Sequence, residues 1–228
     1  MSIKKGDFIR LSFTGKLEDE KIFDTTDEQL AKKNGIFDKD RTYSPMTVIV
    51  GSGFLVEGLE EALIGKNAGY EGTITVPPEK GYGERSLDAI EIVPSKKFDG
   101  DIEPGEMVEY NGRVGFVESV SGGRVKVDYN EPLAGKRLIY SYRIEEVIEG
   151  KGEKIQALLK GYVDENASFS IHDGTIEVDV PKRLALDESW SIGKLLIARF
   201  LISSAELSKV VFRETFTKDD LIDESGEE

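Results

Sequence analysis

The stretch that is most informative about the fold is Phe54-Leu55-Val56-Glu57-Gly58-Leu59-Glu60-Glu61-Ala62-Leu63-Ile64-Gly65. Its apolar residues recur at helical spacing and fall on one face: Leu55, Val56, Leu59, Ala62 and Leu63. Gly65 follows the last of them, and glycine commonly ends a helix because it adopts a left-handed backbone without strain. We therefore predict one short amphipathic helix over this stretch.

Strand patterns lie on both sides of this helix. Residues 7–17 alternate with a period of two: Ile9, Leu11 and Phe13 form the apolar side, and Phe8 falls on the other. This alternation is typical of a strand with one buried face. Further strands are predicted at residues 21–26, 47–50 and 72–76. Residues 27–41, here called the excursion, are mostly charged and are predicted to be exposed, with one helical turn.

A small β unit is predicted over residues 87–130. The dipeptide Asn111-Gly112 between two strand patterns is the strongest short-range signal for a hairpin. A second turn at residues 121–123 leads into the cleanly alternating residues 124–128. The strand pattern of residues 137–147 then returns to the style of the first 86 residues, so residues 87–130 interrupt a domain made of 1–86 and 131–150.

A separate α/β unit is predicted over residues 151–228, after a linker at residues 150–152. Helix patterns at 153–161 and 190–204 alternate with strand patterns at 167–171, 175–180 and 210–216. The long helix is apolar on more than one side, through Trp190, Ile192, Leu195, Leu196, Phe200 and Leu201. Core packing and a dimer contact both account for that composition, and the sequence leaves them open.

Composition excludes several classes of function. The 228 residues carry a formal net charge of −14, which argues against a nucleic-acid partner. The chain has no cysteine, which excludes disulfides and thiolate catalysis and fits a reducing compartment. The first residues form no apolar signal-peptide core, and no stretch approaches 18 uninterrupted apolar residues. We therefore expect a cytoplasmic protein.

No metal or cofactor is expected. His172 is the single histidine, and with no cysteine it cannot form a transition-metal site of the usual kind. The terminal carboxylates from Asp219 to Glu228 lack the spacing of a calcium loop. A metallochaperone is therefore disfavoured.

Six short motifs, taken in order, resemble those of the FKBP-type peptidyl-prolyl cis-trans isomerases. They are Leu11–Gly15, Ile22–Thr25, Val50-Gly51, Leu55–Glu60, Gly81-Tyr82-Gly83 and Leu138-Ile139-Tyr140. The resemblance covers about residues 1–86 and 131–148. The segment from Glu91–Pro94 to Asn130–Gly135 resembles the insert-in-flap domain of SlyD-like members, which binds unfolded chains. The unit beyond residue 151 makes the chain similar to the long archaeal FKBPs.

The resemblance implies an α+β fold. An antiparallel FKBP sheet, a half-barrel, would wrap on one helix, interrupted by the β-rich insert and followed by the α/β C-terminal domain. It also implies a proline-binding pocket, formed by Phe13, Phe23, Asp24, Met46, Leu55, Val56, Leu59, Tyr82 and Tyr140. Taken singly, these are ordinary core, turn or loop residues; the ordered set favours the pocket.

Roles within the pocket also follow from the resemblance. Phe13, Phe23, Leu59 and Tyr140 would make its apolar floor and walls. The Val56 backbone N–H and the Tyr82 hydroxyl would donate to substrate carbonyls. Asp24 would stand at the edge, with its role left open. Leu59 replaces the tryptophan of the short members, and Met46 stands where an aromatic residue is common.

The reaction needs no nucleophile or metal. An Xaa-Pro bond isomerises in tens to hundreds of seconds because resonance raises a rotational barrier of roughly 18–20 kcal/mol. The twisted amide has less charge separation than the planar one, so a water-poor apolar pocket favours it. Each ~1.4 kcal/mol of such preference gives about tenfold in rate.

The insert offers apolar residues for binding polypeptide: Ile90, Ile92, Val93, Met107, Tyr110 and Phe116. Some must pack its own core, and the remainder would bind an extended chain. The expected partners are unfolded polypeptides containing Xaa-Pro bonds, with a homodimer through the C-terminal domain as a further expectation. The alternative is a holdase whose pocket binds peptide without catalysis.

Overall fold

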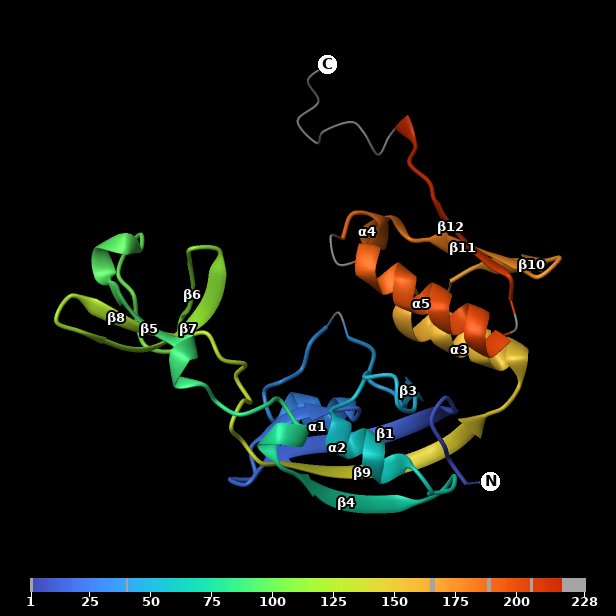
Figure 1. Ribbon diagram of the computed structural model, residues 1–228, viewed down its shortest axis with the longest axis horizontal. Helices are drawn as coiled ribbons and strands as arrows, with labels where there is room; N and C mark the ends of the chain where they lie inside the picture. The colour runs from blue at the N-terminus through green and yellow to red at the C-terminus, as the bar shows by residue number, and fades with distance from the viewer. Residues whose placement is uncertain (1, 40, 165–166, 188–189, 206, 219–228) are drawn as a thin grey trace.

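The computed structural model describes residues 2–39, 41–164, 167–187, 190–205 and 207–218. Figure 1 shows three units, here called the N-terminal domain, the insert and the C-terminal domain, and the bounds predicted from the sequence are kept for them below. The insert and the C-terminal domain project from opposite ends of the N-terminal domain toward the same side, and the excursion rises between them (Figure 1). The mixed α+β architecture confirms the predicted fold class.

The N-terminal domain is an antiparallel sheet covered by one helix. Its strands are β1 (Phe8–Leu17), β2 (Ile22–Thr25), β3 (Met46–Ile49), β4 (Glu71–Val76) and β9 (Leu138–Ile148). They run in the order β2-β1-β9-β4, and β3 also pairs with β1. Helix α2 (Glu57–Leu63) packs Leu59 and Leu63 against the sheet, and the Tyr142 hydroxyl donates to the Ala62 carbonyl at 3.2 Å.

Helix α2 is shorter than its sequence pattern. Val56 is the N-cap, so Leu55 and Val56 precede the helix although they share its apolar spacing. At the other end Gly65 has a φ of +81°, as predicted, and its N–H donates to the Ile3 carbonyl at 2.8 Å. Within the excursion, helix α1 (Glu28–Lys33) is capped by the Asp27 side chain, which accepts from the Leu30 N–H.

The insert is a four-stranded sheet with one buried face. Its strands are β5 (Ile90–Pro94), β6 (Met107–Tyr110), β7 (Arg113–Ser121) and β8 (Arg124–Asp128), in the order β5-β8-β7-β6. Asn111 and Gly112 both have positive φ, at 52° and 71°, as the predicted hairpin turn requires. Short 3-10 turns lie at Pro78–Lys80, Leu87–Ala89 and Ser95–Lys97.

The C-terminal domain packs helices on a three-stranded sheet. Its elements are α3 (Lys151–Tyr162), β10 (Phe169–His172), β11 (Thr175–Val180), α4 (Lys182–Ala185), α5 (Trp190–Ala205) and β12 (Lys209–Glu214). The sheet order is β10-β11-β12, and β11 and β12 are parallel because α4 and α5 form the crossover between them.

The C-terminal domain shares a hydrophobic core with the N-terminal domain. Phe8, Ile49 and Ile148 pack with Ile155 and Leu158 of α3. Phe8 is therefore buried at 1% exposure, although alternation placed it on the polar side of β1. Helix α3 begins at Lys151, so the linker predicted at 150–152 is mostly helix, and the two domains are firmly docked.

Candidate active site

Three aromatic rings from three neighbouring strands form the centre of the site. Phe13 of β1 and Phe23 of β2 both contact Tyr140 of β9 edge to face, with ring centroids 6.0 Å and 5.7 Å apart. Gly15 lies between the rings: a Cβ atom there would be 2.6 Å from Phe23 Cζ and 2.9 Å from Tyr140 Cε1. The absence of a side chain at residue 15 thus lets both rings approach β1.

Aliphatic residues complete the apolar surface. Leu59 of α2 is buried at 1% exposure beside the aromatic rings. Leu55, Val56 and Met46 are half-buried against the same cluster. Val56, as the N-cap of α2, occupies a position whose own N–H has no partner inside the helix. The structure therefore brings together the apolar residues that the resemblance assigned to the pocket.

Polar groups lie at the rim of this apolar cluster. Tyr82 is 41% exposed, on a turn held by bonds from the Gly83 N–H to the Pro78 carbonyl and from the Gly135 N–H to the Gly83 carbonyl, both 2.8 Å. Asp24 accepts a bond from Arg41 Nη1 at 2.5 Å. Arg41 ends the excursion, and sequence spacing offered no signal that it would pair with a residue 17 positions earlier.

The two phenols at the site stay protonated over a wide pH range. Burial, together with the negative charge of Asp24, raises the pKa of Tyr82, although a hydrogen bond with Tyr140 lowers it in part. Burial also raises the pKa of Tyr140, with smaller effects from Tyr82 and Asp24. Both hydroxyls are therefore neutral donors at neutral pH.

Comparison with known proteins places the chain in a family. Residues 1–104 match the family described as FKBP-type peptidyl-prolyl cis-trans isomerase. A short-type peptidyl-prolyl cis-trans isomerase of Methanocaldococcus jannaschii is 40% identical over 154 residues, covering 66% of this chain and 98% of that protein. The chain belongs to the FKBP-type peptidyl-prolyl cis-trans isomerases.

Further matches cover the other two units of this FKBP-type isomerase. Residues 92–133 match the family described as FKBP26, IF domain, and residues 151–217 match FKBP26_C-terminal. A SlyD isomerase of Helicobacter pylori is 30% identical over 128 residues, or 54% of this chain and 69% of that protein. A probable FKBP-type isomerase of Pseudomonas fluorescens is 32% identical over 145 residues, or 61% and 87%.

Raised phenol pKa values predict the pH dependence of the FKBP-type reaction. We expect kcat/KM for an Xaa-Pro peptide to stay level to about pH 10, the ordinary phenol pKa, because Tyr82 keeps its donor proton. Folding stability should fall as the pH rises through about 10, because the unfolded chain then releases phenol protons that the folded one retains. A pH profile of kcat/KM tests the expectation for activity, and an apparent pKa below 9 that disappears in Tyr82→Phe contradicts it.

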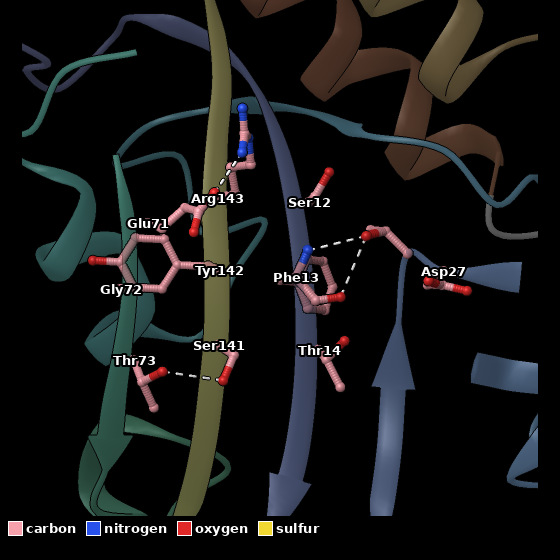
Figure 2. A pocket seen from close by; sticks show the side chains of 11 residues that line it. Ser12, Phe13, Thr14, Asp27, Glu71, Gly72, Thr73, Ser141, Tyr142 and Arg143 are labelled. Carbon is pink, nitrogen blue, oxygen red and sulfur yellow. Dashed lines mark hydrogen bonds and ion pairs between the residues drawn. The ribbon is translucent and has the colours of Figure 1, made fainter. Parts of the chain in front are cut away.

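A hollow of about 510 Å³ lies on the outer face of the same sheet and is shown in Figure 2. Its side chains are bonded to one another: Thr73 to Ser141, and Arg143 to Glu71 (Figure 2). Phe13 meets it with its backbone, whose N–H donates to Thr26 Oγ1 at 3.0 Å. Hydroxyl groups and an ion pair occupy this hollow, whereas the aromatic rings gather on the other face, so the aromatic cluster remains the candidate active site of the FKBP fold.

The residues assigned to the insert divide between its two faces. Ile92, Met107 and Phe116 are exposed, at 60%, 68% and 40%. Val93, at 1% exposure, belongs to the insert's own core, and Tyr110 packs against that core. Ile90 is half-buried. Val93 therefore offers no surface to a bound chain.

Neither a metal-binding cluster nor a membrane-spanning helix is present among the described residues. The described ranges contain no cluster of three or more histidine and acidic side chains that could hold a metal ion. His172 ends the short strand β10, and the acidic residues 219–228 lie outside the described residues. Among the described helices, none is long and apolar enough to cross a bilayer.

Proposed function

We propose that this isomerase accelerates protein folding and that its insert acts as a chaperone, holding unfolded polypeptide next to the active site. The observation that carries the proposal is the exposed apolar pair Met107 and Phe116 on the outer face of the insert. Holding a chain there raises the local concentration of its prolyl bonds at the pocket, which increases turnover without any new contact at the reacting bond.

The insert sheet carries apolar side chains on both of its faces, although only one face is buried. Val117 and Val127 pack into its core on one face. On the other face Met107 lies directly opposite Phe116 in the β6–β7 ladder, and both are exposed. Exposed apolar patches of this kind mark interaction surfaces.

Strand β6 adds a second means of binding. It stands at the end of the order β5-β8-β7-β6, so its outer edge has no strand partner within the described residues. An open edge offers backbone N–H and C=O groups that an extended client chain can pair with. Side-chain and backbone contacts would then act together on an unfolded chain, whatever its sequence.

The insert is joined to the N-terminal domain beside the active site. Two chain segments connect the two units there. The Asn130 side chain forms two hydrogen bonds with Ser86: it accepts from the Ser86 N–H at 2.8 Å and donates to the Ser86 carbonyl at 2.9 Å. Arg85 bonds Asp128 on the insert at 2.7 Å. Tyr82 lies only a few residues before Ser86, so a polypeptide bound to the insert would be held close to the pocket.

Catalysis is tested by a protease-coupled assay on an Xaa-Pro tetrapeptide. We expect Tyr82→Phe and Asp24→Leu each to lower kcat/KM by about tenfold, which corresponds to the loss of one interaction of ~1.4 kcal/mol in the transition state. Circular dichroism checks that both variants are folded. If the folded wild type does not accelerate isomerisation of the tetrapeptide, the non-catalytic holdase becomes the leading function.

Holding is tested by the suppression of aggregation of a chemically unfolded protein. The double variant Met107→Ser/Phe116→Ser should lose most of the suppression and keep full tetrapeptide activity, because its changes lie only on the outer face of the insert. Val120→Ser is the matched control, since Val120 is 39% exposed on the same strand, β7, but pairs with the core residue Val125. Equal suppression of aggregation by all three proteins would contradict the proposal that the insert holds unfolded polypeptide.

We also propose that the protein forms a homodimer through the C-terminal domain and works in the cytoplasm. Helix α5 exposes an apolar stripe formed by Ile192, Leu195, Leu196 and Ile202. Burying such a stripe against a second copy removes it from water. Sedimentation equilibrium at micromolar concentration tests the dimer, and a single species at 25.3 kDa excludes it.

The lack of cysteine supports the cytoplasmic location, which cell fractionation tests.

A further inference from the structure

A groove of about 790 Å³ lies between the docked N-terminal and C-terminal domains. One wall consists of Arg10, Thr26 and residues 41–42 and 44–47, and the other of residues 160–164 and 183–184. The walls are fixed relative to one another, because the Tyr162 hydroxyl donates to the Thr47 carbonyl at 3.0 Å. Tyr162 also stacks on Phe54 with ring centroids 4.5 Å apart. The groove is therefore a permanent feature of the docked domains.

The groove adjoins the active site through two shared residues. Met46 packs against the apolar cluster of the site and also lines the groove. Arg41 lines the groove and holds Asp24 at the rim of the site. A polypeptide whose prolyl residue occupies the pocket can therefore continue past Met46 into the groove.

Several cationic side chains gather along the groove of this acidic protein. Its lining includes Arg10, Arg41, Lys160, Arg183 and the carboxylate Asp164. Arg10 and Arg41 pair with Glu146 and Asp24, which lie outside the lining, and the whole chain carries a net charge of −14. Acidic peptides are repelled by the chain as a whole, so a local set of cations is what would let one bind.

The arginines of the groove are held in place without using all their donors. Arg10 bonds Glu146 through Nε at 2.7 Å, and Arg183 bonds Asp164 through Nη2 at 2.9 Å. A guanidinium carries five N–H donors in one plane, so an arginine held by one carboxylate can still bond a second one. The pairing orients these side chains and leaves them able to bind a ligand carboxylate.

We propose that this groove is an extended subsite for acidic residues that flank the prolyl bond of the client. The proposal rests on the isomerase activity and adds a preference to it: a client with aspartate or glutamate a few residues from its proline is turned over faster than one without. Apolar residues in the lining, Pro45, Met46, Tyr162 and Leu184, would contact the backbone and stems of the same segment.

The test compares three substrates: an Xaa-Pro tetrapeptide, and two longer peptides with the same centre flanked by acidic or by amide residues. We expect the wild type to prefer the acid-flanked peptide in kcat/KM by about fivefold at low salt, the range given by a few partly exposed ion pairs. The preference should shrink above 0.1 M salt, where the Debye length falls to about 10 Å or less. Equal kcat/KM for the two long peptides at low salt overturns the proposal.

Variants of the C-terminal wall separate the groove from the pocket. Arg183→Gln/Lys160→Gln should reduce the preference to less than about twofold and leave the tetrapeptide rate unchanged, because neither residue belongs to the N-terminal domain. The control Arg199→Gln/Lys209→Gln removes the same two charges from exposed positions of the same domain outside the groove lining and should keep the preference. An equal loss in both variants indicates a general charge effect and overturns the proposal. If the wild type does not accelerate isomerisation of the tetrapeptide, the catalytic function itself is refuted.

Discussion

Replacing Gly15 by alanine is expected to lower kcat/KM for an Xaa-Pro tetrapeptide by about tenfold or more, the equivalent of ~1.4 kcal/mol of transition-state stabilisation. An added methyl group would lie 2.6 Å from Phe23 Cζ and 2.9 Å from Tyr140 Cε1. One or both rings must then move, and these rings form the centre of the candidate active site. The change acts on the shape of the site without removing any of its side chains.

Gly152→Ala is the matched control for this prediction. Gly152 lies in α3, and a Cβ atom there would meet nothing within 4 Å. It should leave activity unchanged and raise stability slightly, because alanine is favoured over glycine in a helix by about 1 kcal/mol. Wild-type activity in a folded Gly15→Ala variant would show that the close approach of the rings to β1 is not needed for catalysis.

Gly115→Ala is expected to unfold the insert and thereby abolish the suppression of aggregation that we propose for it. Gly115 lies on β7, and a Cβ atom there would be 2.8 Å from the Asp128 carbonyl oxygen and equally close to the Val127 and Tyr129 side chains. A clash with the backbone of β8 cannot be relieved by rotating a side chain. Overpacking of this kind costs about 1–3 kcal/mol, which a core centred on five buried valines can hardly absorb.

The same variant should keep its tetrapeptide activity. The insert has its own core, and the side chains that bond it to the N-terminal domain join Arg85 and Ser86 to Glu118, Asp128 and Asn130. Hydrogen exchange measured by mass spectrometry would show protection lost in β5–β8 and retained in β1 and β9. Equal protection in both proteins, with full suppression of aggregation, contradicts the prediction.

The features predicted correctly from the sequence are those set by local patterns. The hairpin at Asn111-Gly112 needs only two residues with positive φ, and Gly65 ends α2 for the same local reason. The order of the FKBP motifs was sufficient to identify the residues around Tyr140, because those motifs lie on neighbouring strands of one sheet.

Features that depend on distant partners could not be predicted. Alternation placed Phe8 on the polar side of β1, and only the docked C-terminal domain buries it. The same alternation cannot tell which face of the insert is covered, so Val93 and Ile92 looked equivalent. The pair of Arg41 and Asp24 joins two loops through space, and no periodicity reports it.

Strand β9 determines the order in which the chain can complete its domains during synthesis. It lies between β1 and β4 in the sheet, yet it follows the whole insert in the chain. The insert depends on local hairpins, so it can form while β1 and β4 still await the strand that joins them. Ile148 at the end of β9 then enters the shared core with α3, so the C-terminal domain docks on a sheet that has just closed. The insert of the nascent isomerase can thus fold before its own catalytic domain is complete.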